Sequence, residues 1–379
     1  MGTLEKLIAQ LCPDGVEYKP LGEVLKYEQP TKYIVHSTEY DDSYATPVLT
    51  AGQSFVLGYT DETDNHYQAS KESPVIIFDD FTTATQWVDF EFKVKSSAMK
   101  ILSLRNREVA DIRYIYFAIQ CIGFTPGEHT RHWIEKYSKF EIPLPPLSVQ
   151  KEIVRMLDDM AGLIDALEEE LAARKKQYEW CRERMLRTDD AEIMSLGEIC
   201  DYSTKRISAS SLNTHTYICV ESMLQNKCGK VDAASVPELG NLIAYEKGDV
   251  LIGNIRPYLK KIWLADVDGG TNGDVLVVQR KDKNLITSEY LYYVLSSDEF
   301  FLYDMQYAKG AKMPRGDKAA IMKYSIPVPP LNVQNKIVRI LDDMTELIAA
   351  LEDELAARKQ QYEYYRDKLL AFKRKPEVA

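Results

Sequence analysis

Two long stretches of the chain repeat apolar residues in alternating steps of three and four. Residues at this spacing, sustained over about four to five heptads, predict the seam of a coiled coil. The alternative is two separate amphipathic helices, each on its own domain, which would favour a wider stripe with a 3.6-residue period. The positions expected to pair the helices are Ile153, Leu157, Met160, Ile164, Leu167 and Leu171 in one stretch and Ile337, Leu341, Met344, Ile348, Leu351 and Leu355 in the other.

The two stretches are copies of one another. Residues 142–186 read IPLPPLSVQKEIVRMLDDMAGLIDALEEELAARKKQYEWCRERML, and residues 326–370 read IPVPPLNVQNKIVRILDDMTELIAALEDELAARKQQYEYYRDKLL. A second match, LGE at residues 21–23 and again at 196–198, opens each copy of a larger module. Two units are too few to stack as a solenoid, so the pattern indicates duplication of a whole module.

The interiors of the two modules differ in sequence but alternate short β-type runs with turns. Runs such as SPVIIFDDF and GDVLIGNI predict strands, and ADIRYIYFAIQCI and SEYLYYVLSSDEFFLYDM predict one helix in each module. The expected fold class is therefore mixed α/β, with two globular α+β domains separated by the long helices. The expected divisions are a helical segment at 1–18, domains at 19–141 and 191–325, and repeat helices within 142–190 and 326–379.

The connection between the helices predicts their direction. A helix of about 40 residues is about 60 Å long. A compact domain of about 130 residues has a radius of gyration near 14 Å, so it bridges nearby points more easily than distant ones. We therefore expect an antiparallel, intramolecular, pseudo-two-fold symmetric pair.

Composition narrows the class of protein. Hydrophobic residues make up 45% of the chain, and no apolar run approaches the roughly 20 residues that span a bilayer. The six cysteines lack metal or disulfide spacing, and the first residues lack a signal peptide, so we expect a cytoplasmic protein. The net charge of −11 disfavours a general polyanion binder, but basic residues gather locally within 256–315.

The whole chain resembles the specificity subunits of type I restriction-modification enzymes. The resemblance is carried by the paired PLPPLxxQxxIVxxLD helices, by the LGE starts, and by the segments LCPDGVEYKPLGEV and GAKMPRGDKAAIMKYSIPVPPL. It implies that each variable domain is a target recognition domain that reads half of a bipartite asymmetric DNA site. It also implies that the helices set the spacing of the halves and dock two methyltransferase subunits, through which restriction (motor-nuclease) subunits join.

The chain lacks the motifs of the reactions such a complex performs. Neither an adenine-methyltransferase DPPY or NPPF sequence nor a GxxxxGK[ST] phosphate loop is present. We therefore expect no catalysis and no cofactor in this chain, with S-adenosylmethionine, ATP and magnesium used by the partner subunits. Two alternatives are a structural protein–protein adaptor and a metal-dependent nuclease built from Asp79 or Asp80 with Glu91 and Lys93.

Candidate DNA-contacting residues lie on loops rich in hydrogen-bond donors, because Arg, Lys and Asn reach phosphates and base edges. In the second module these loops are residues 254–261 and 309–317. Counting back from each PLPPL sequence, Arg315 aligns with Arg131, so two loops occupy equivalent places. The DNA-binding candidates are Arg131, His129, His132, Thr130, Asn254, Arg256, Lys260, Lys261, Lys312 and Arg315.

Overall fold

The computed structural model describes residues 2–51, 54–127, 130–187 and 191–376. Two compact units are present, one comprising Met1–Glu168 with Asp353–Ala379 and the other Glu169–Glu352. Each unit therefore contains one domain and one half of each long helix. None of the helices that the structure describes is long and apolar enough to cross a membrane.

The part of the first unit that the structure describes contains helices, two larger sheets and the two-stranded sheet β1-β9. The four-stranded sheet has the order β2-β8-β5-β6, and the three-stranded sheet has the order β4-β3-β7. The elements are α1 (Thr3–Leu11), β1 (Glu17–Pro20), α2 (Leu21–Val24), β2 (Leu25–Glu28), η1 (Pro30–Tyr33), β3 (Thr46–Leu49), β4 (Val56–Thr60), β5 (Val75–Asp79), β6 (Thr85–Val88), β7 (Lys93–Val94), β8 (Met99–Leu104), α3 (Ile112–Gln120), η2 (Tyr137–Lys139), β9 (Glu141–Leu144) and the start of α4 (Leu147–Leu186).

Strand β5 lies inside its sheet, and this position accounts for the apolar run Val75–Phe78. Ile76 and Phe78 face a cluster that contains α3 and the start of α4. Val75 and Ile77 face a second cluster that contains Leu49 and Val94 of the smaller sheet. Both faces of the strand are thus buried, and alternation of polar and apolar residues is lost.

The second unit has two four-stranded sheets, in the orders β11-β18-β15-β16 and β12-β14-β17-β13. Its expected single helix at SEYLYYVLSSDEFFLYDM is two helices, because Ser297 caps a new one by accepting from the N–H of Phe300. The elements are β10 (Glu192–Ser195), α5 (Leu196–Ile199), β11 (Cys200–Tyr202), β12 (Arg206–Ser208), η3 (Ala209–Ser211), β13 (Tyr217–Ile218), β14 (Asn241–Tyr245), β15 (Val250–Gly253), η4 (Pro257–Leu259), β16 (Ile262–Leu264), β17 (Gly269–Thr271), β18 (Val275–Arg280), α6 (Ser288–Leu295), α7 (Asp298–Tyr307), α8 (Lys318–Ile321), β19 (Ser325–Val328) and the start of α9 (Leu331–Leu369).

Each domain contains a four-stranded sheet of the same topology, although the two domain sequences differ. Strand order β2-β8-β5-β6 in one matches β11-β18-β15-β16 in the other. The registers agree as well, because Ile76 lies opposite Leu102 and Val250 lies opposite Val278. The expected mixed α/β class is confirmed, and the two modules prove similar in topology as well as in layout.

Burial along the long helices follows the heptad seam. Ile153 and Leu157 of α4, and Leu341 of α9, are fully buried, and most later seam positions are less exposed than their neighbours. The same heptad spacing continues to Cys181 and Tyr365, where the pattern ends: Arg182 and Arg366, the residues that follow them, are the more buried.

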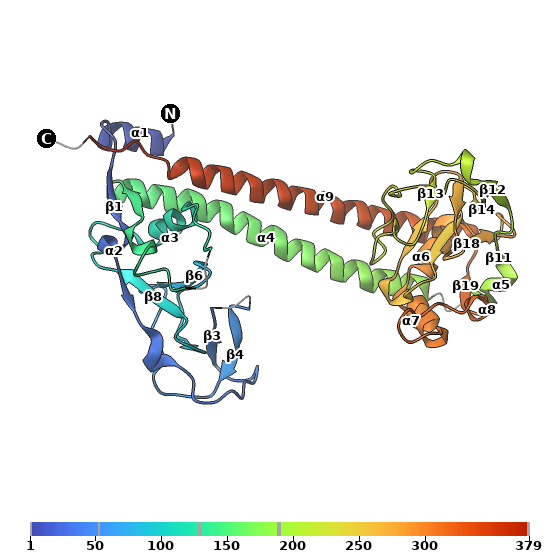
Figure 1. Cartoon of the computed structure of the whole chain (residues 1–379), viewed down its shortest axis with the longest axis horizontal. Helices are drawn as coiled ribbons and strands as arrows, with labels where there is room; N and C mark the ends of the chain where they lie inside the picture. Colours follow the sequence, from blue (N-terminus) through green and yellow to red (C-terminus); the bar gives the residue numbers. More distant parts are fainter. Residues whose placement is uncertain (1, 52–53, 128–129, 188–190, 377–379) are drawn as a thin grey trace. The chain divides into compact units, whose positions relative to one another are not determined.

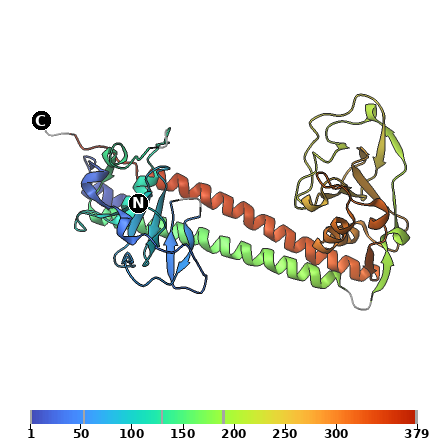
Figure 2. The same ribbon diagram turned by 60° about the horizontal axis from the view of Figure 1, so that its bottom comes forward.

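The halves of α4 and α9 run antiparallel within each unit, as expected (Figures 1 and 2). In the first unit Ile153, near the start of α4, shares a core with Leu370, the residue directly after α9. In the second unit Leu186, at the end of α4, shares a core with Ile337 near the start of α9. Half-exposed ion pairs agree with this register: Lys359–Glu168 at 2.5 Å in the first unit and Lys175–Glu352 at 2.6 Å in the second.

The IPLPP and IPVPP segments belong to the domains and not only to the helices. Strand β9 pairs with β1, and β19 pairs with β10, so the expected divisions at 141/142 and 325/326 fall inside strands. The proline pair then ends each strand, and the helix begins at Leu147 or Leu331.

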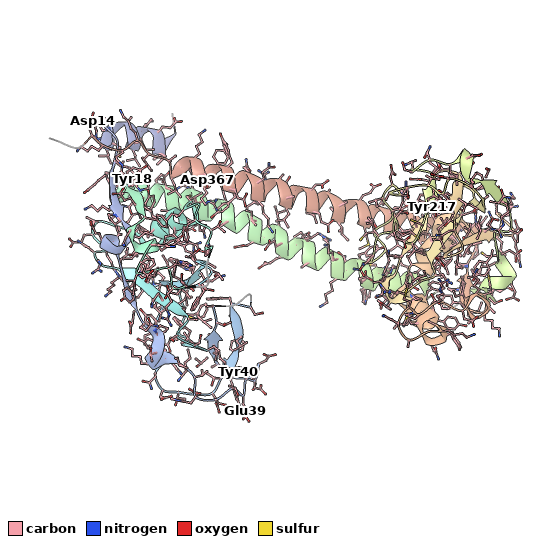
Figure 3. The ribbon with its side chains drawn as sticks, viewed as in Figure 1. Asp14, Tyr18, Glu39, Tyr40, Tyr217 and Asp367 are labelled. Carbon is pink, nitrogen blue, oxygen red and sulfur yellow. The ribbon has the colours of Figure 1, made fainter. Side chains whose placement is uncertain are left out.

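The beginning and the end of the chain pair with each other in the first unit. The N–H of Val16 donates to the Lys373 carbonyl at 2.8 Å, and the Lys375 N–H donates to Val16 at 2.9 Å. The hydroxyl of Tyr18, labelled in Figure 3, donates to the Phe372 carbonyl at 2.7 Å. The C-terminal segment thus lies beside the start of β1.

Candidate nucleic-acid interface

The two candidate loops of the second unit meet. Ile255 and Arg315 form an antiparallel bridge, and the Arg256 N–H donates to the Pro314 carbonyl at 2.7 Å. The Gly316 N–H donates to the Asn254 carbonyl at 3.1 Å. Two segments that are far apart in sequence therefore form one surface.

Arg315 lies at the exposed edge of this surface. Its Nη1 donates to Asp274 Oδ1 at 2.7 Å, and its side chain is 55% exposed. Its backbone pairs with that of Lys309 through two hydrogen bonds of 2.9 Å, which close the loop over Lys312. Arg256 and Lys312 are exposed as well, so three cationic side chains are available to a phosphate or base edge.

Lys260 is held by a carboxylate. Lys260 and Lys227 lie 3.0 and 2.7 Å from Asp298 Oδ1. Burial disfavours ionisation of Asp298, but hydrogen bonds from the two lysines outweigh it and lower its pKa to about 2. Arg256, Lys260, Lys227 and Asn226 all have positive φ, and backbone of this kind concentrates where a loop has a task besides folding.

Two of the candidates in the second unit point inward. Asn254 is 5% exposed, and Lys261 is 9% exposed with its Nζ donating to the Val220 carbonyl at 2.6 Å. A direct DNA contact does not fit these side chains, because β15 and β16 lead them into the domain. The sequence of residues 254–261 indicated a basic loop, but the side chains of such a loop point in different directions, and some of them point into the domain.

The equivalent loop of the first unit holds fewer described candidates. Arg131 is half exposed and lies 3.8 Å from Asp80 Oδ2, and Thr130 is exposed. His132 is 1% exposed and packs edge-on against Phe124, so its ring supports the loop and does not reach the surface. His129 lies outside the described residues.

The loops of the two units share one backbone frame. The Asp80 N–H donates to Ala98 at 3.1 Å, as that of Asn254 donates to Asp274 at 2.9 Å. The His132 N–H donates to the Asp80 carbonyl at 2.9 Å, as that of Gly316 donates to Asn254.

Arg131 and Arg315 therefore occupy equivalent positions, each directly before the residue whose N–H donates to Asp80 or Asn254. Asp80, which the sequence suggested only as a nuclease ligand, takes the place of Asn254. Comparison of the runs SPVIIFDD and GDVLIGN was the signal that could have shown this equivalence.

The residues of the nuclease alternative lie beside different partners, and Glu91 lies 3.9 Å from His66 Nδ1. Lys93 is fully buried and lies 2.7 Å from Glu62, whereas Asp80 lies 3.3 Å from Lys100. Burial opposes ionisation of Glu62, but the Lys93 hydrogen bond and backbone N–H groups lower its pKa to about 2.

Among the described residues, one group, His36, Glu62 and Asp64, has ligand atoms close enough for a metal ion. Lys93 lies within ion-pairing distance of both carboxylates and already supplies the positive charge there. Lys93 therefore has a structural role.

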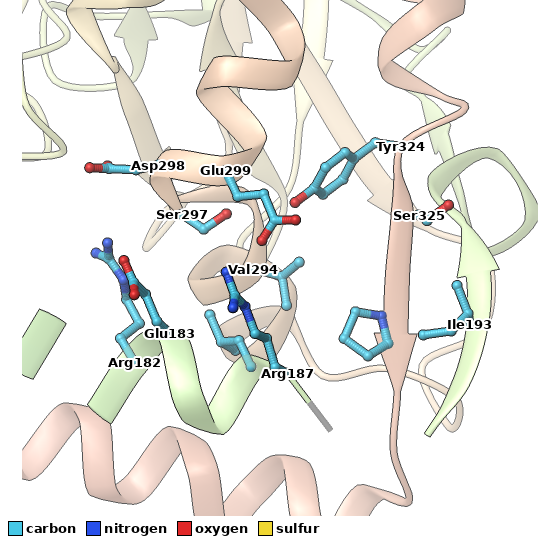
Figure 4. Close-up of a pocket in the computed structure, with 12 residues that line it drawn as sticks. Arg182, Glu183, Arg187, Ile193, Val294, Ser297, Asp298, Glu299, Tyr324 and Ser325 are labelled. Atoms are coloured by element: carbon cyan, nitrogen blue, oxygen red, sulfur yellow. The ribbon is translucent and has the colours of Figure 1, made fainter. Parts of the chain in front are cut away.

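A pocket of about 470 Å³ lies between the end of α4 and the start of α7 (Figure 4). The guanidinium groups of Arg182 and Arg187 point toward the side where Asp298 and Glu299 lie. Glu183 adds a third carboxylate to the lining. Because these charges offset one another, the pocket offers no site for a polyanion.

Comparisons with known proteins agree with the duplicated architecture. A family described as the type I restriction modification DNA specificity domain matches residues 13–174 and again 188–358. The chain is 36% identical over 418 residues to the "Type I restriction enzyme EcoR124I/EcoR124II specificity subunit" of Escherichia coli, covering 100% of this chain and 98% of that protein. A putative specificity subunit of Haemophilus influenzae is 27% identical, with 97% and 98% covered.

Two solved structures share the fold. One is the type I restriction-modification S subunit of M. genitalium, with a TM-score of 0.58, 14% identity, and 96% and 97% of the chains covered. The other belongs to a study of complex assembly and conformational transition of the type I R-M system, with a TM-score of 0.52 and 17% identity over 95% and 97%.

Proposed function

Because the chain belongs to the family of type I restriction-modification DNA specificity domains, we propose that it is the DNA-specificity subunit of such a complex. Each recognition domain reads one half of a bipartite, asymmetric DNA site. The observation that carries this proposal is the loop frame built twice, with Arg131 and Arg315 at the same position and Asp80 and Asn254 differing beneath them. The same backbone arrangement carries different side chains in the two domains, as expected if the domains recognise two different half-sites.

The exposed cations of the frame are the proposed DNA contacts. Arg315, Arg256 and Lys312 serve the second half-site, and Arg131 and Thr130 serve the first. Lys260 contacts phosphate only if it leaves Asp298, so its role is secondary. The overall charge of −11 is compatible with this role, because partner subunits provide further phosphate contacts.

The outer faces of the helices are the proposed docking sites for two copies of one methyltransferase subunit. A stripe of exposed residues is repeated almost unchanged, and its aromatic member is 60% exposed as Trp180 and 59% exposed as Tyr364. A neighbouring exposed position differs between the copies, because Lys176 is replaced by Gln360. The stripe comprises Glu170, Ala173, Gln177, Trp180 and Arg184 in the second unit and Glu354, Ala357, Gln361, Tyr364 and Lys368 in the first.

The chain itself is proposed to be non-catalytic. The methyltransferase subunits use S-adenosylmethionine, and the restriction subunits that join the complex use ATP and magnesium. The complex acts on double-stranded DNA in the cytoplasm, and the paired helices set the number of unread base pairs between the half-sites.

Methylome sequencing tests this function. Cells that express the chain with its modification subunit should carry methylated adenines in one bipartite sequence. Replacing residues 19–141 by the matching domain of a relative should change one half of that sequence and leave the other half and the spacer unchanged. Changes in both halves, or no methylated motif, would contradict the proposal.

A further inference from the structure

Asp304 of α7 is a buried carboxylate that the proposed DNA contacts do not use. It is 1% exposed, and neither carboxylate oxygen has a hydrogen-bond partner among the described residues. Three cations of the neighbouring loops pair with other carboxylates: Lys260 with Asp298, Lys309 with Asp317, and Arg315 with Asp274. An ionised Asp304 would therefore be a buried charge without compensation, which is unfavourable.

Asp304 lies directly beneath the meeting point of the two loops. A Cβ atom on Gly316 would run into Asp304 Oδ1 and would lie 2.7 Å from Asn254 Oδ1. Asn254 Oδ1 is also buried and without a hydrogen-bond partner in the part of the chain that the structure describes. Two acceptor oxygens thus converge on one glycine, and no hydrogen lies between them unless Asp304 is protonated.

The surroundings favour the protonated form of Asp304. Burial raises the pKa of Asp304 to about 6. The hydroxyl of Tyr202, which faces it from β11, donates to the Lys318 carbonyl at 3.1 Å and is committed there. Other titratable or charged side chains on elements packed against α7 are Arg256, Tyr258 and Lys260 around η4, Asp317 and Lys318 at α8, and Glu289, Tyr290, Tyr292 and Tyr293 on α6. Tyr324 packs against Phe300 and Tyr303 of α7, and Lys227, Arg182 and Arg187 lie on the side of Asp298 and Glu299.

We infer that Asp304 is a positioning residue that takes up a proton from solvent when the second unit binds DNA and then donates a hydrogen bond to Asn254 Oδ1. The bond joins α7 to residues 254 and 316, and so holds the loops that carry Arg256 and Arg315 in one register. This inference rests on the proposed function, because bound phosphates supply the negative potential that favours the acid.

The pH dependence of DNA binding tests this role. The probe is a duplex with the methylome-defined site, bound by the complex of the chain with its modification subunits at constant salt between pH 5.5 and 8.5. The affinity of the unmodified complex should fall as pH rises, by at most about tenfold per pH unit for one proton. Asp304→Asn stays neutral and retains a donor, so its affinity should be high and should lack this part of the slope.

Glu299→Gln is the matched control, because it removes an exposed carboxylate from the same helix. This variant should keep the full slope. If Asp304→Asn kept it as well, or lost affinity equally at every pH, the inference would be overturned; equal loss would indicate an ionised Asp304 that accepts from the Asn254 amide. Absence of sequence-specific binding by the unmodified complex would instead contradict the proposed function.

Discussion

The side-chain oxygen of Gln150 accepts a hydrogen bond from the backbone N–H of Asp111 at 2.8 Å. The amide nitrogen of Gln150 donates to the carbonyls of Val109 and Pro145, so one fully buried side chain joins α4 to the segment before α3. Gln334 repeats the arrangement with Thr287, Leu285 and Pro329. Each recognition domain is thereby locked to the start of a long helix.

Removing either glutamine should destabilise its unit. Gln150→Ala leaves one buried and two partly buried backbone groups without their partner, and a cost of about 2–4 kcal/mol in the free energy of unfolding is expected. Gln334→Ala should cost a similar amount, measured by urea unfolding. Gln360→Ala, on the exposed side of α9, is the control and should stay within about 0.5 kcal/mol of the unmodified chain.

The paired arginines should act on separate half-sites. Arg315→Ala should weaken binding by about 1–3 kcal/mol and relax the sequence preference only in the second half-site, if the guanidinium reaches a base edge. Arg131→Ala should do the same for the first half-site. Each variant is the control for the other, and binding to duplexes altered in one half-site is the measurement. Equal weakening for all sequences, with a salt slope reduced by about one, would indicate phosphate contacts instead.

Gly316 should not tolerate a side chain. Gly316→Ala would place a methyl group against Asp304 and Asn254, which forces the loop of Arg315 to move. Binding to the second half-site should fall by at least about tenfold. The sequence preference for the first half-site, measured by methylation of duplexes altered only there, should not change. Gly273→Ala, whose Cβ would meet nothing within 4 Å, is the matched control. Normal binding by Gly316→Ala would show that the loop adapts freely.

The repeated stripe should set the stoichiometry of the complex. Trp180→Ala and Tyr364→Ala should each cost about 2 kcal/mol or more at one docking site, because exposed aromatic residues often anchor interfaces. Native mass spectrometry should then show one modification subunit for either variant, none for the double variant, and two for the unmodified chain. Lys176→Ala and Gln360→Ala should retain two subunits. Two bound subunits in the double variant would place the docking surface elsewhere.

The buried Asp304 should make the stability of the free chain depend on pH. Its pKa is raised from 3.8 to about 6, so its favourable contribution is complete below about pH 3.8 and is lost as pH rises through 6. Asp304→Asn should therefore be more stable than the unmodified chain by about 2–3 kcal/mol at pH 8 and nearly equal to it at pH 4. Urea unfolding at the two pH values measures this, with Glu299→Gln as control. A difference that does not change with pH would be inconsistent with burial of a titrating acid.

Much of the scaffold was predictable because it depends on local pattern. The heptad spacing that begins at Ile153 and Ile337 is written along each helix, and it predicted both the helices and their buried seam. The antiparallel direction followed from the length of chain between the copies, and the pairs Lys359–Glu168 and Lys175–Glu352 agree with it. The duplicated PLPPL segments predicted two similar modules without any knowledge of their strands.

Which of the candidate side chains are exposed depended on contacts between distant segments, and the sequence alone does not show these contacts. The sequence proposed Arg315 and the equivalent Arg131, which the fold leaves exposed, but it also proposed His132 and Lys261, which the fold buries. Whether a polar residue faces water is decided by segments distant in the chain, such as β5 against β8 or residue 255 against residue 315. The place of Asp304 beneath Gly316 is of the same kind, because α7 and the loop meet only after folding. The sequence by itself thus determined the duplication and the helices, whereas the tertiary structure decided which side chains reach the surface, since burial is a property of non-local packing.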